Sequence, residues 1–515
     1  MNERRALLKT LAAASGVALL PRALRAAAPS LPEFPFTLGV ASGYPDDRSV
    51  VLWTRLAPQP DQPGGGMPPR DVPVRYEVAA DDAFRRIVKR GDATAASSFA
   101  HSVHQTVTGL APARDYWYRF VAGDHVSATG RTRTLPAARD RVASLRIALA
   151  CCQNYEHAHY AAWRHLAAAP PQMVVFVGDY IYETNQRGPS LRRHTGGVAQ
   201  SLDEYRQRYA LYQSDPSLRA AHAAAPWFAV WDDHEVNNDY AGTTPGREED
   251  PAVFLARRAA AYQAWYEHLP VPPSMAPRNG VMNIQARAQL GRLATLHLLD
   301  QRQYRSPEAC PRPPQLGGQR VGDECTERLD AARTMLGAEQ ERWLQQGLKQ
   351  NTAPWTLLAQ GTPFSQINQG SAEAPQYAAD GWTGYAAARR RLLDSLQQTR
   401  TVNPVILGGD IHAFLVGDVG AVPEQPDSKL VASEFVTTSI SSNAISQAAL
   451  DKWRENGPRL HKVDGTHRGY IAFTLTPKQL RADLVEVEDA SRPDSPSRIG
   501  SAWVIEAGNP AIQPA

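Results

Sequence analysis

The chain has 515 residues, of which 43% are hydrophobic and 21% are charged, as is usual for soluble globular proteins. Its formal net charge is +3, and residues 1–28 hold five basic side chains and one acidic one, which leaves −1 for the remainder. A nearly neutral body argues against a general nucleic-acid or anionic-membrane binder, and we expect no specific nucleic-acid site. The length is enough for a large core and more than one domain.

Residues 1–28 are typical of a targeting segment. Paired arginines in "NERRALLKT" precede "LAAASGVALL", an apolar run of ten residues that is too short to span a bilayer, and Ala26–Ala28 suit a cleavage site. The pattern resembles a twin-arginine export signal, which implies the twin-arginine export machinery as a partner and a periplasmic or secreted location. The alternative is a frayed basic N-terminus. We expect no transmembrane segment in the mature protein, because no second long apolar run follows.

Residues 29–136 predict a small all-β sandwich of the fibronectin or immunoglobulin type. Short β-rich runs such as "SVVLWTRL", "VPVRYEVA" and "DYWYRFVAG" are separated by turn residues at the spacing of a sandwich. The stretch "TGLAPARDYWYRF" resembles a fibronectin type III strand pair, with Leu110 and Tyr116 where that family places its turn leucine and corner tyrosine. We expect this domain to end near Pro136.

Residues 137–515 alternate β-rich runs with helical ones, which indicates an α/β domain. The runs "LRIALACC", "MVVFVGD" and "NPVILGGDIH" have the apolar character of buried strands, and "SLDEYRQRYALYQ" opens with a helix capping box, Ser201 to Glu204. Cys310 and Cys325 bracket a Pro/Gly-rich loop, and in an oxidising compartment they predict a disulfide.

Five of the predicted strands end in polar groups, in "ALACCQN", "FVGDYIY", "VWDDHE", "LLAQG" and "ILGGDIH". In open α/β sheets the binding residues gather beyond the carboxyl ends of the strands. One polar strand end is often an ordinary turn, and a lone buried cysteine is usually a small apolar side chain. Four endings with good metal donors in one domain nevertheless favour a metal site.

The segments "GDYIYE", "WDDHEVNND", "LDQRQYR" and "GGDIHAF" resemble those of the PhoD-type alkaline phosphatase/phosphodiesterase family, within the binuclear metallophosphatases. The resemblance covers most of the chain, including the sandwich and the export signal. It implies a metallophosphatase-like α/β fold, with two stacked mixed sheets flanked by helices and preceded by the small sandwich. It also implies Fe³⁺ in one metal site and Ca²⁺, or another divalent ion, in a second.

The same resemblance assigns the metal ligands, with Asp179 bridging the two ions. Thiolate and phenolate donors suit trivalent iron, and oxygen donors suit a hard divalent ion. Tyr182 has an alternative role as a core aromatic, and Gln360 as an amide satisfied by the backbone. The implied first site is Cys152, Asp179, Tyr182 and His412; the second is Asp179, Asp233 and Asp410, with Gln360 as a weaker candidate.

Two further residues are implied to act on the substrate. His234 would protonate the leaving oxygen or stabilise the transition state. Arg302 would clamp a phosphate oxygen with two hydrogen bonds, unless it pairs with a structural acid. Residues 366–385 resemble a loop over the site.

We therefore expect an exported metal-dependent alkaline phosphatase that hydrolyses phosphate monoesters, diesters or both through attack by a metal-activated hydroxide. An alternative at the same site is a phosphodiesterase or phospholipase D-like activity. A distant alternative is a non-catalytic binding protein that uses the sandwich for contact, and the intact strand-end ligands argue against it.

Overall fold

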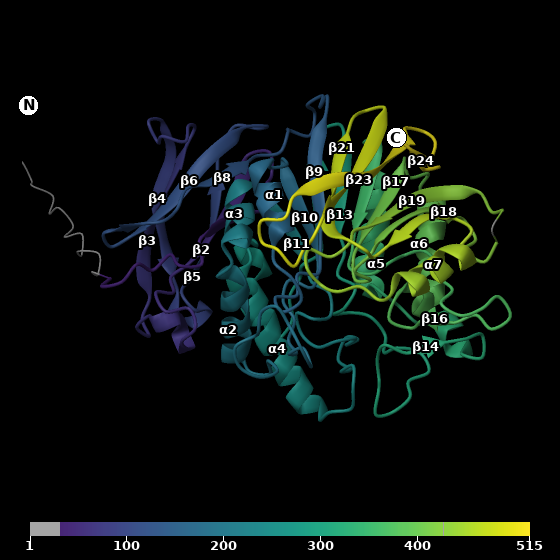
Figure 1. Ribbon diagram of the computed structural model, residues 1–515. Helices are drawn as coiled ribbons and strands as arrows, with labels where there is room; N and C mark the ends of the chain where they lie inside the picture. The colour runs from purple at the N-terminus through teal and green to yellow at the C-terminus, as the bar shows by residue number, and fades with distance from the viewer. Residues whose placement is uncertain (1–30, 426) are drawn as a thin grey trace, which may run out of the picture.

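The computed structural model describes residues 31–425 and 427–515, and Figure 1 shows a small all-β region beside a larger body of sheets and helices. The predicted export signal at residues 1–28 lies outside the described residues. Two large mixed sheets form the body, and their facing side chains share one core that includes Val175, Leu357 and Phe435. The expected fold of stacked mixed sheets with helices and an N-terminal all-β region is confirmed. Across the described part of the chain, no helix has the length and apolarity needed to cross a membrane.

The first sheet has ten strands. Their order is β24 (Gln513–Pro514), β23 (Ser497–Glu506), β22 (Gln479–Val487), β21 (Arg468–Leu475), β9 (Leu145–Ala150), β10 (Met173–Val177), β11 (Trp227–Val230), β1 (Val40–Gly43), β2 (Ser49–Arg55) and β5 (Ser102–Thr108). The central strands β9, β10 and β11 run parallel to one another, so their carboxyl ends meet at one edge. Their apolar runs are almost wholly buried, as expected for parallel strands covered on both faces.

The second sheet has seven strands. Their order is β12 (Ala286–Leu290), β13 (Ala294–Leu298), β15 (Trp355–Ala359), β17 (Pro404–Gly408), β19 (Leu430–Val436), β18 (Phe414–Gly420) and β20 (Leu460–Asp464). The strands β13, β15, β17 and β19 are parallel, and the remaining three are antiparallel to their neighbours. The second sheet therefore also presents several carboxyl strand ends at a single edge.

The N-terminal sandwich shares strands with the first large sheet, which the sequence did not predict. One of its layers is β4 (Ile87–Ala95), β3 (Val72–Ala79), β6 (Asp115–Ala122), β7 (His125–Val126) and β8 (Gly130–Arg133). The other layer is β1, β2 and β5, and the core between the layers includes Leu52, Tyr118 and Phe120. Strand β1 joins β11 at Gly43, where a Cβ atom would lie 2.3 Å from the carbonyl oxygen of Pro270, so only glycine permits this approach.

Helices cover the large sheets. Trp163 of α1 packs against Phe176 and Trp227 of the first sheet, and Figure 1 shows α2 and α4 side by side near the sandwich. The predicted capping box of Ser201 and Glu204 is present at the start of α2. The helices are α1 (Ala161–Ala168), α2 (Leu202–Gln213), α3 (Pro216–Ala224), α4 (Pro251–His268), α5 (Gly337–Gln350), α6 (Ala386–Gln398) and α7 (Gln447–Asn456), with short 3-10 turns at Pro63–Gly66, Ser97–Phe99, Pro273–Met275, Thr326–Leu329 and Trp382–Tyr385.

The predicted disulfide between Cys310 and Cys325 is present and closes a loop between β13 and α5. Within that loop β14 (Arg320–Val321) pairs with β16 (Tyr377–Ala378), so the closed loop anchors the segment 366–385. The other two cysteines, Cys151 and Cys152, are buried free thiols at the end of β9.

Candidate metal centre

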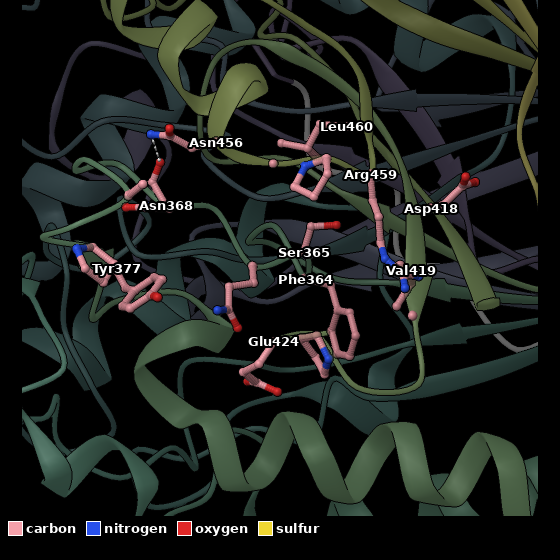
Figure 2. Close-up of a pocket in the computed structure, with 17 residues that line it drawn as sticks. Phe364, Ser365, Asn368, Tyr377, Asp418, Val419, Glu424, Asn456, Arg459 and Leu460 are labelled. Atoms are coloured by element: carbon pink, nitrogen blue, oxygen red, sulfur yellow. Dashed lines mark hydrogen bonds between the residues drawn. The ribbon is translucent and has the colours of Figure 1, made fainter. Parts of the chain in front are cut away.

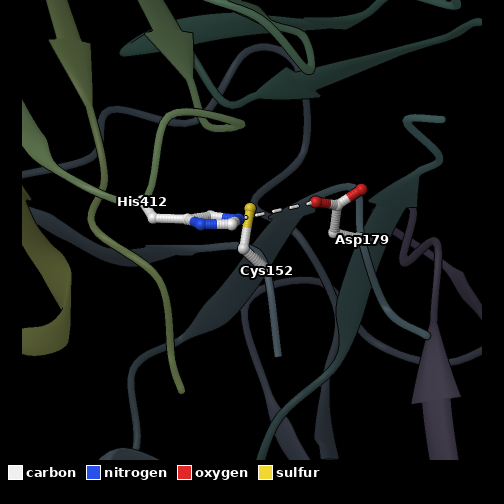
Figure 3. Close-up of side chains that lie close together, drawn as sticks. All are labelled: Cys152, Asp179 and His412. Atoms are coloured by element: carbon white, nitrogen blue, oxygen red, sulfur yellow. Dashed lines mark ion pairs between the residues drawn. The ribbon is translucent and has the colours of Figure 1, made fainter. Parts of the chain in front are cut away.

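The predicted ligands meet where the carboxyl ends of strands from both large sheets come together. Cys152 follows β9 and Asp179 follows β10 in the first sheet, whereas His412 follows β17 in the second. The donor atoms of these three side chains all lie within 4.8 Å of one another, and Figure 3 shows them facing a common point. The carboxylates of Asp179 and Asp233 form a second such cluster with His234. Asp179 therefore belongs to both clusters.

The backbone at these positions is strained. Cys152, Asp179, Asp410 and His412 have φ values of 57°, 58°, 70° and 56°, in the left-handed region that costs about 1–3 kcal/mol for most residues. Gly178, with φ of 105°, precedes Asp179, and a Cβ atom there would lie 2.4 Å from the Cβ atom of Asp232. The glycine thus lets the end of β10 turn sharply and direct the carboxylate of Asp179 into the site.

Tyr182 connects the two sides of the first cluster. Its hydroxyl donates to Asp179 Oδ2 at 2.8 Å and lies 2.9 Å from His412 Nε2. His412 Nδ1 lies 2.7 Å from the carbonyl oxygen of Asn443 and donates to it, which leaves Nε2 as an acceptor. One phenol proton is thus shared between two acceptors, whereas a cation at this point would satisfy the phenolate, the carboxylate and the imidazole together.

Several groups at the site have polar capacity that the protein leaves unused. Asp179 Oδ1 is buried without a hydrogen-bond partner. Burial raises the pKa of both Cys152 and Tyr182 well above their ordinary values, so each is neutral unless a cation stabilises its anion. Burial also raises the pKa of Asp179, but the charge of His234 and the contacts with His412 and Tyr182 outweigh it and lower that pKa to about 2. These residues fit a metal ion.

His234 is held beside the clusters by Glu183. Its Nδ1 lies 2.8 Å from Glu183 Oε2, and its ring lies against that of Tyr182, with 4.1 Å between the ring centroids. Burial lowers the pKa of His234, but the carboxylates of Asp233, Glu183 and Asp179 outweigh burial and raise it well above its ordinary value.

Glu183 was not among the predicted site residues, although it lies in the segment "GDYIYE". Two more contacting residues were not predicted: Ser442, whose hydroxyl donates to the Tyr182 oxygen at 2.8 Å, and Glu235, which accepts the backbone N–H groups of Asp179 and Asp232. Their local sequence gives no signal that would show these contacts.

Arg302 and Gln360 are placed differently from the roles that the resemblance implied. The Arg302 guanidinium is fully buried and binds the carboxylates of Asp232 and Asp380, which favours the structural pairing over a phosphate clamp. The Gln360 side-chain oxygen accepts from Gln301 and Trp382, and its amide nitrogen donates to a backbone carbonyl, so its polar atoms are already satisfied.

Asp410 belongs to neither close cluster, although it lies two residues before His412. Burial and the neighbouring carboxylates of Asp232, Asp380 and Asp233 raise its pKa well above the ordinary value. The close contacts at the site therefore involve Cys152, Asp179, Tyr182, Asp233, His234 and His412, but not Asp410.

A cavity of about 260 Å³ opens beside the first cluster. It reaches the cluster through His157, whose ring centroid lies 6.5 Å from that of Tyr182, and through Asn443, the hydrogen-bond partner of His412. The remaining lining residues are Glu156, Gln186, Pro189, Ser190 and Leu191. None of the predicted metal ligands lines this cavity.

A second cavity, of about 250 Å³, lies between the segment 364–377, strand β18 and the start of β20 (Figure 2). Phe364, Tyr377, Val419 and Leu460 give it an apolar lining, and Glu424 lies at its edge. None of the predicted metal ligands lines it. The segment 366–385 thus lines this cavity and, through Asp380, contacts Arg302.

Two packed sheets with donor residues at their strand ends define a metallophosphatase-like protein. The purple acid phosphatase of yellow lupin (Lupinus luteus) shares this fold, with a TM-score of 0.59 at 10% identity over 92% of this chain and 75% of that one. A solved structure of PhoD matches with a TM-score of 0.90 at 39% identity, over 95% of this chain and 93% of that one.

The sequence comparisons point to the same group. The PhoD-like phosphatase model matches residues 147–484, and the model of its N-terminal domain matches residues 23–136. Alkaline phosphatase D of Bacillus subtilis (strain 168) is 42% identical over 488 residues, which is 93% of this chain and 82% of the relative. The chain belongs to the PhoD-like phosphatase family and is a phosphoric ester hydrolase.

Proposed function

We propose that this phosphatase is exported and hydrolyses phosphate monoesters, diesters or both at a centre of two metal ions. The observation that carries the proposal is the cluster of Cys152, Asp179 and His412, donors from three strand ends and two sheets that lie within 4.8 Å of one another. The predicted leader at residues 1–28 supports export through the twin-arginine machinery to a periplasmic or extracellular location.

The chemistry of the donors supports an assignment of the two metals. Cys152, Tyr182, His412 and Asp179 would hold Fe³⁺, because thiolate and phenolate are strong anionic donors. Asp179, Asp233 and Asp410 would hold Ca²⁺ or another hard divalent ion. When bound, the ions supply Lewis acidity that activates water and neutralises phosphoryl charge.

The residues of the chain would then orient the substrate and move one proton. His234 Nδ1 is occupied by Glu183, so its Nε2 is the atom that can protonate the leaving oxygen. Glu183, which is fully buried, stabilises the charged imidazole. The cavity at His157 and Leu191 would receive the organic group.

Diester hydrolysis, including phospholipase D-like cleavage, remains a candidate at the same centre. The cavity beside the first cluster supports it, since a diester carries a second organic group that needs room next to the phosphorus. The alternative of a non-catalytic binding protein is excluded by the membership of the chain in a family of phosphatases.

Metal removal and restoration test the proposal. Purified protein treated with a chelator should lose hydrolysis of both p-nitrophenyl phosphate and bis-p-nitrophenyl phosphate, and iron together with calcium should restore it. The ratio of monoester to diester hydrolysis then measures which ester the enzyme prefers. Full activity of protein shown to be metal-free by elemental analysis would contradict the proposal.

A further inference from the structure

Asp380 binds two buried arginines. It lies two residues after the end of strand β16. Its carboxylate accepts hydrogen bonds from Arg302 Nη1 at 2.6 Å, from Arg302 Nη2 at 2.9 Å and from Arg305 Nη2 at 2.5 Å. The two arginines are 0% and 3% exposed. Removing one partner of a buried ion pair strongly destabilises the folded protein, because the other charge is left buried and unpaired. The position of Arg302 therefore depends on Asp380.

Arg302 connects Asp380 to the proposed second metal site. Its Nε donates to Asp232, and its Nη2 lies 3.7 Å from Asp233 Oδ1. The other oxygen of Asp233, Oδ2, accepts the backbone N–H of Asp239 at 2.6 Å. Asp233 is thus positioned between a guanidinium and a backbone amide.

Resting on the proposed function, we propose that Asp380 is a positioning residue for the divalent ion. By binding the Nη1 and Nη2 atoms of Arg302, it keeps the guanidinium from pairing fully with Asp233 and leaves Asp233 Oδ1 available to the metal. Asp380 itself need not touch the ion or the substrate. The segment 366–385 would then support the metal centre through this contact.

The disulfide-closed loop holds Asp380 in place. Strand β14 pairs with β16, and the backbone N–H of Ala379 donates to Gln319 at 2.8 Å. Ala379 also packs in a small apolar cluster with Val321 and Cys325. Asp380 is therefore attached to the covalently closed loop on one side and to the arginines on the other.

The test is calorimetric titration of CaCl₂ into full-length protein that has been freed of divalent ions. Asp380→Asn should weaken calcium binding by about 10–100-fold, as is typical when an outer partner of a metal ligand is lost. Added calcium should restore kcat, and Asp380→Glu should bind calcium with an affinity between those of Asp380→Asn and the wild type. Asp323→Asn is the matched control, because Asp323 is an exposed carboxylate of the closed loop that also pairs with an arginine, Arg328. The control should bind calcium as the wild type does.

Each other outcome overturns the inference in a distinguishable way. Calcium binding by Asp380→Asn that equals the wild type would contradict the positioning role alone. A raised KM at saturating calcium, with unchanged calcium affinity, would show that Asp380 acts on the substrate instead. Wild-type protein that binds no calcium would contradict the proposed calcium site and this inference together. If Asp380→Asn does not fold, wild-type calcium affinity in Asp380→Glu would overturn the proposal.

Discussion

At the scale of single residues, the contacts of His234 and Asp233 fit two different proposed roles, proton transfer for His234 and metal binding for Asp233. Asp233 lies in the cluster with Asp179 and has both carboxylate oxygens near hydrogen-bond donors, as a positioned ligand requires. His234 lies in the same cluster, but its Nδ1 is bound by the buried carboxylate of Glu183. Adjacent residues in the chain can therefore serve metal binding and proton transfer separately.

His234→Ala should keep both metals and lose kcat on alkyl phosphates by about 10²–10⁴-fold, the usual contribution of a general acid. The loss on p-nitrophenyl phosphate should be much smaller, because its aryl oxide leaves readily without a proton. Kinetics on both substrates, together with metal stoichiometry, check this prediction.

The comparison with Asp233→Ala completes that experiment, since this variant should lose the divalent ion and fail on both substrates. Loss of metal from His234→Ala would show that His234 is a ligand. Equal slowing of both substrates with metals retained would show that it acts on the phosphoryl group.

The candidate ligands could be proposed from the sequence because they lie shortly after apolar strands, in segments that resemble those of the family. Asp179 after "MVVFVG" and His412 after "PVILGGDI" carry this local signal. The supporting contacts could not be predicted, since Ser442 reaches Tyr182 across 260 residues and Asp380 reaches Arg302 across 78. Such pairings depend on tertiary packing, and their residue types are common in ordinary loops.

At the scale of elements, the closed loop and the short strand pair next to it stabilise a region with little regular structure. The loop between β13 and α5 contains only two-residue β14 as a strand, and it is tied by the bond between Cys310 and Cys325. The same pair of elements ends beside Asp380. The composition of the loop predicted the disulfide. It did not predict that the loop supports Asp380, the residue that binds Arg302 and Arg305.

Replacing both Cys310 and Cys325 by Ser should lower the free energy of unfolding by about 3 kcal/mol, because the unfolded chain regains the entropy that the closed loop removes. Denaturant unfolding with and without reductant measures the effect. Reductant should destabilise the wild type and leave the double variant unchanged. Equal stability of the oxidised wild type and the double variant would contradict this role.

At the scale of the whole molecule, the proposed iron site joins the two large sheets. Cys152, Asp179 and Tyr182 come from the first sheet and its connections, whereas His412 follows a strand of the second. The shared strands of the sandwich extend the first sheet at its far side, a pairing of β1 with β11 that local sequence does not encode. Metal binding at the proposed site would therefore link the two large sheets at the edge where their carboxyl strand ends meet.

The central claim is that Cys152, Tyr182 and His412 hold iron together with Asp179. The most direct measurement is elemental analysis of the purified protein combined with its visible absorption spectrum. We predict about one iron ion per chain and a charge-transfer band from thiolate or phenolate, which Tyr182→Phe should shift or bleach. A colourless, iron-free wild type with full phosphatase activity would contradict the account.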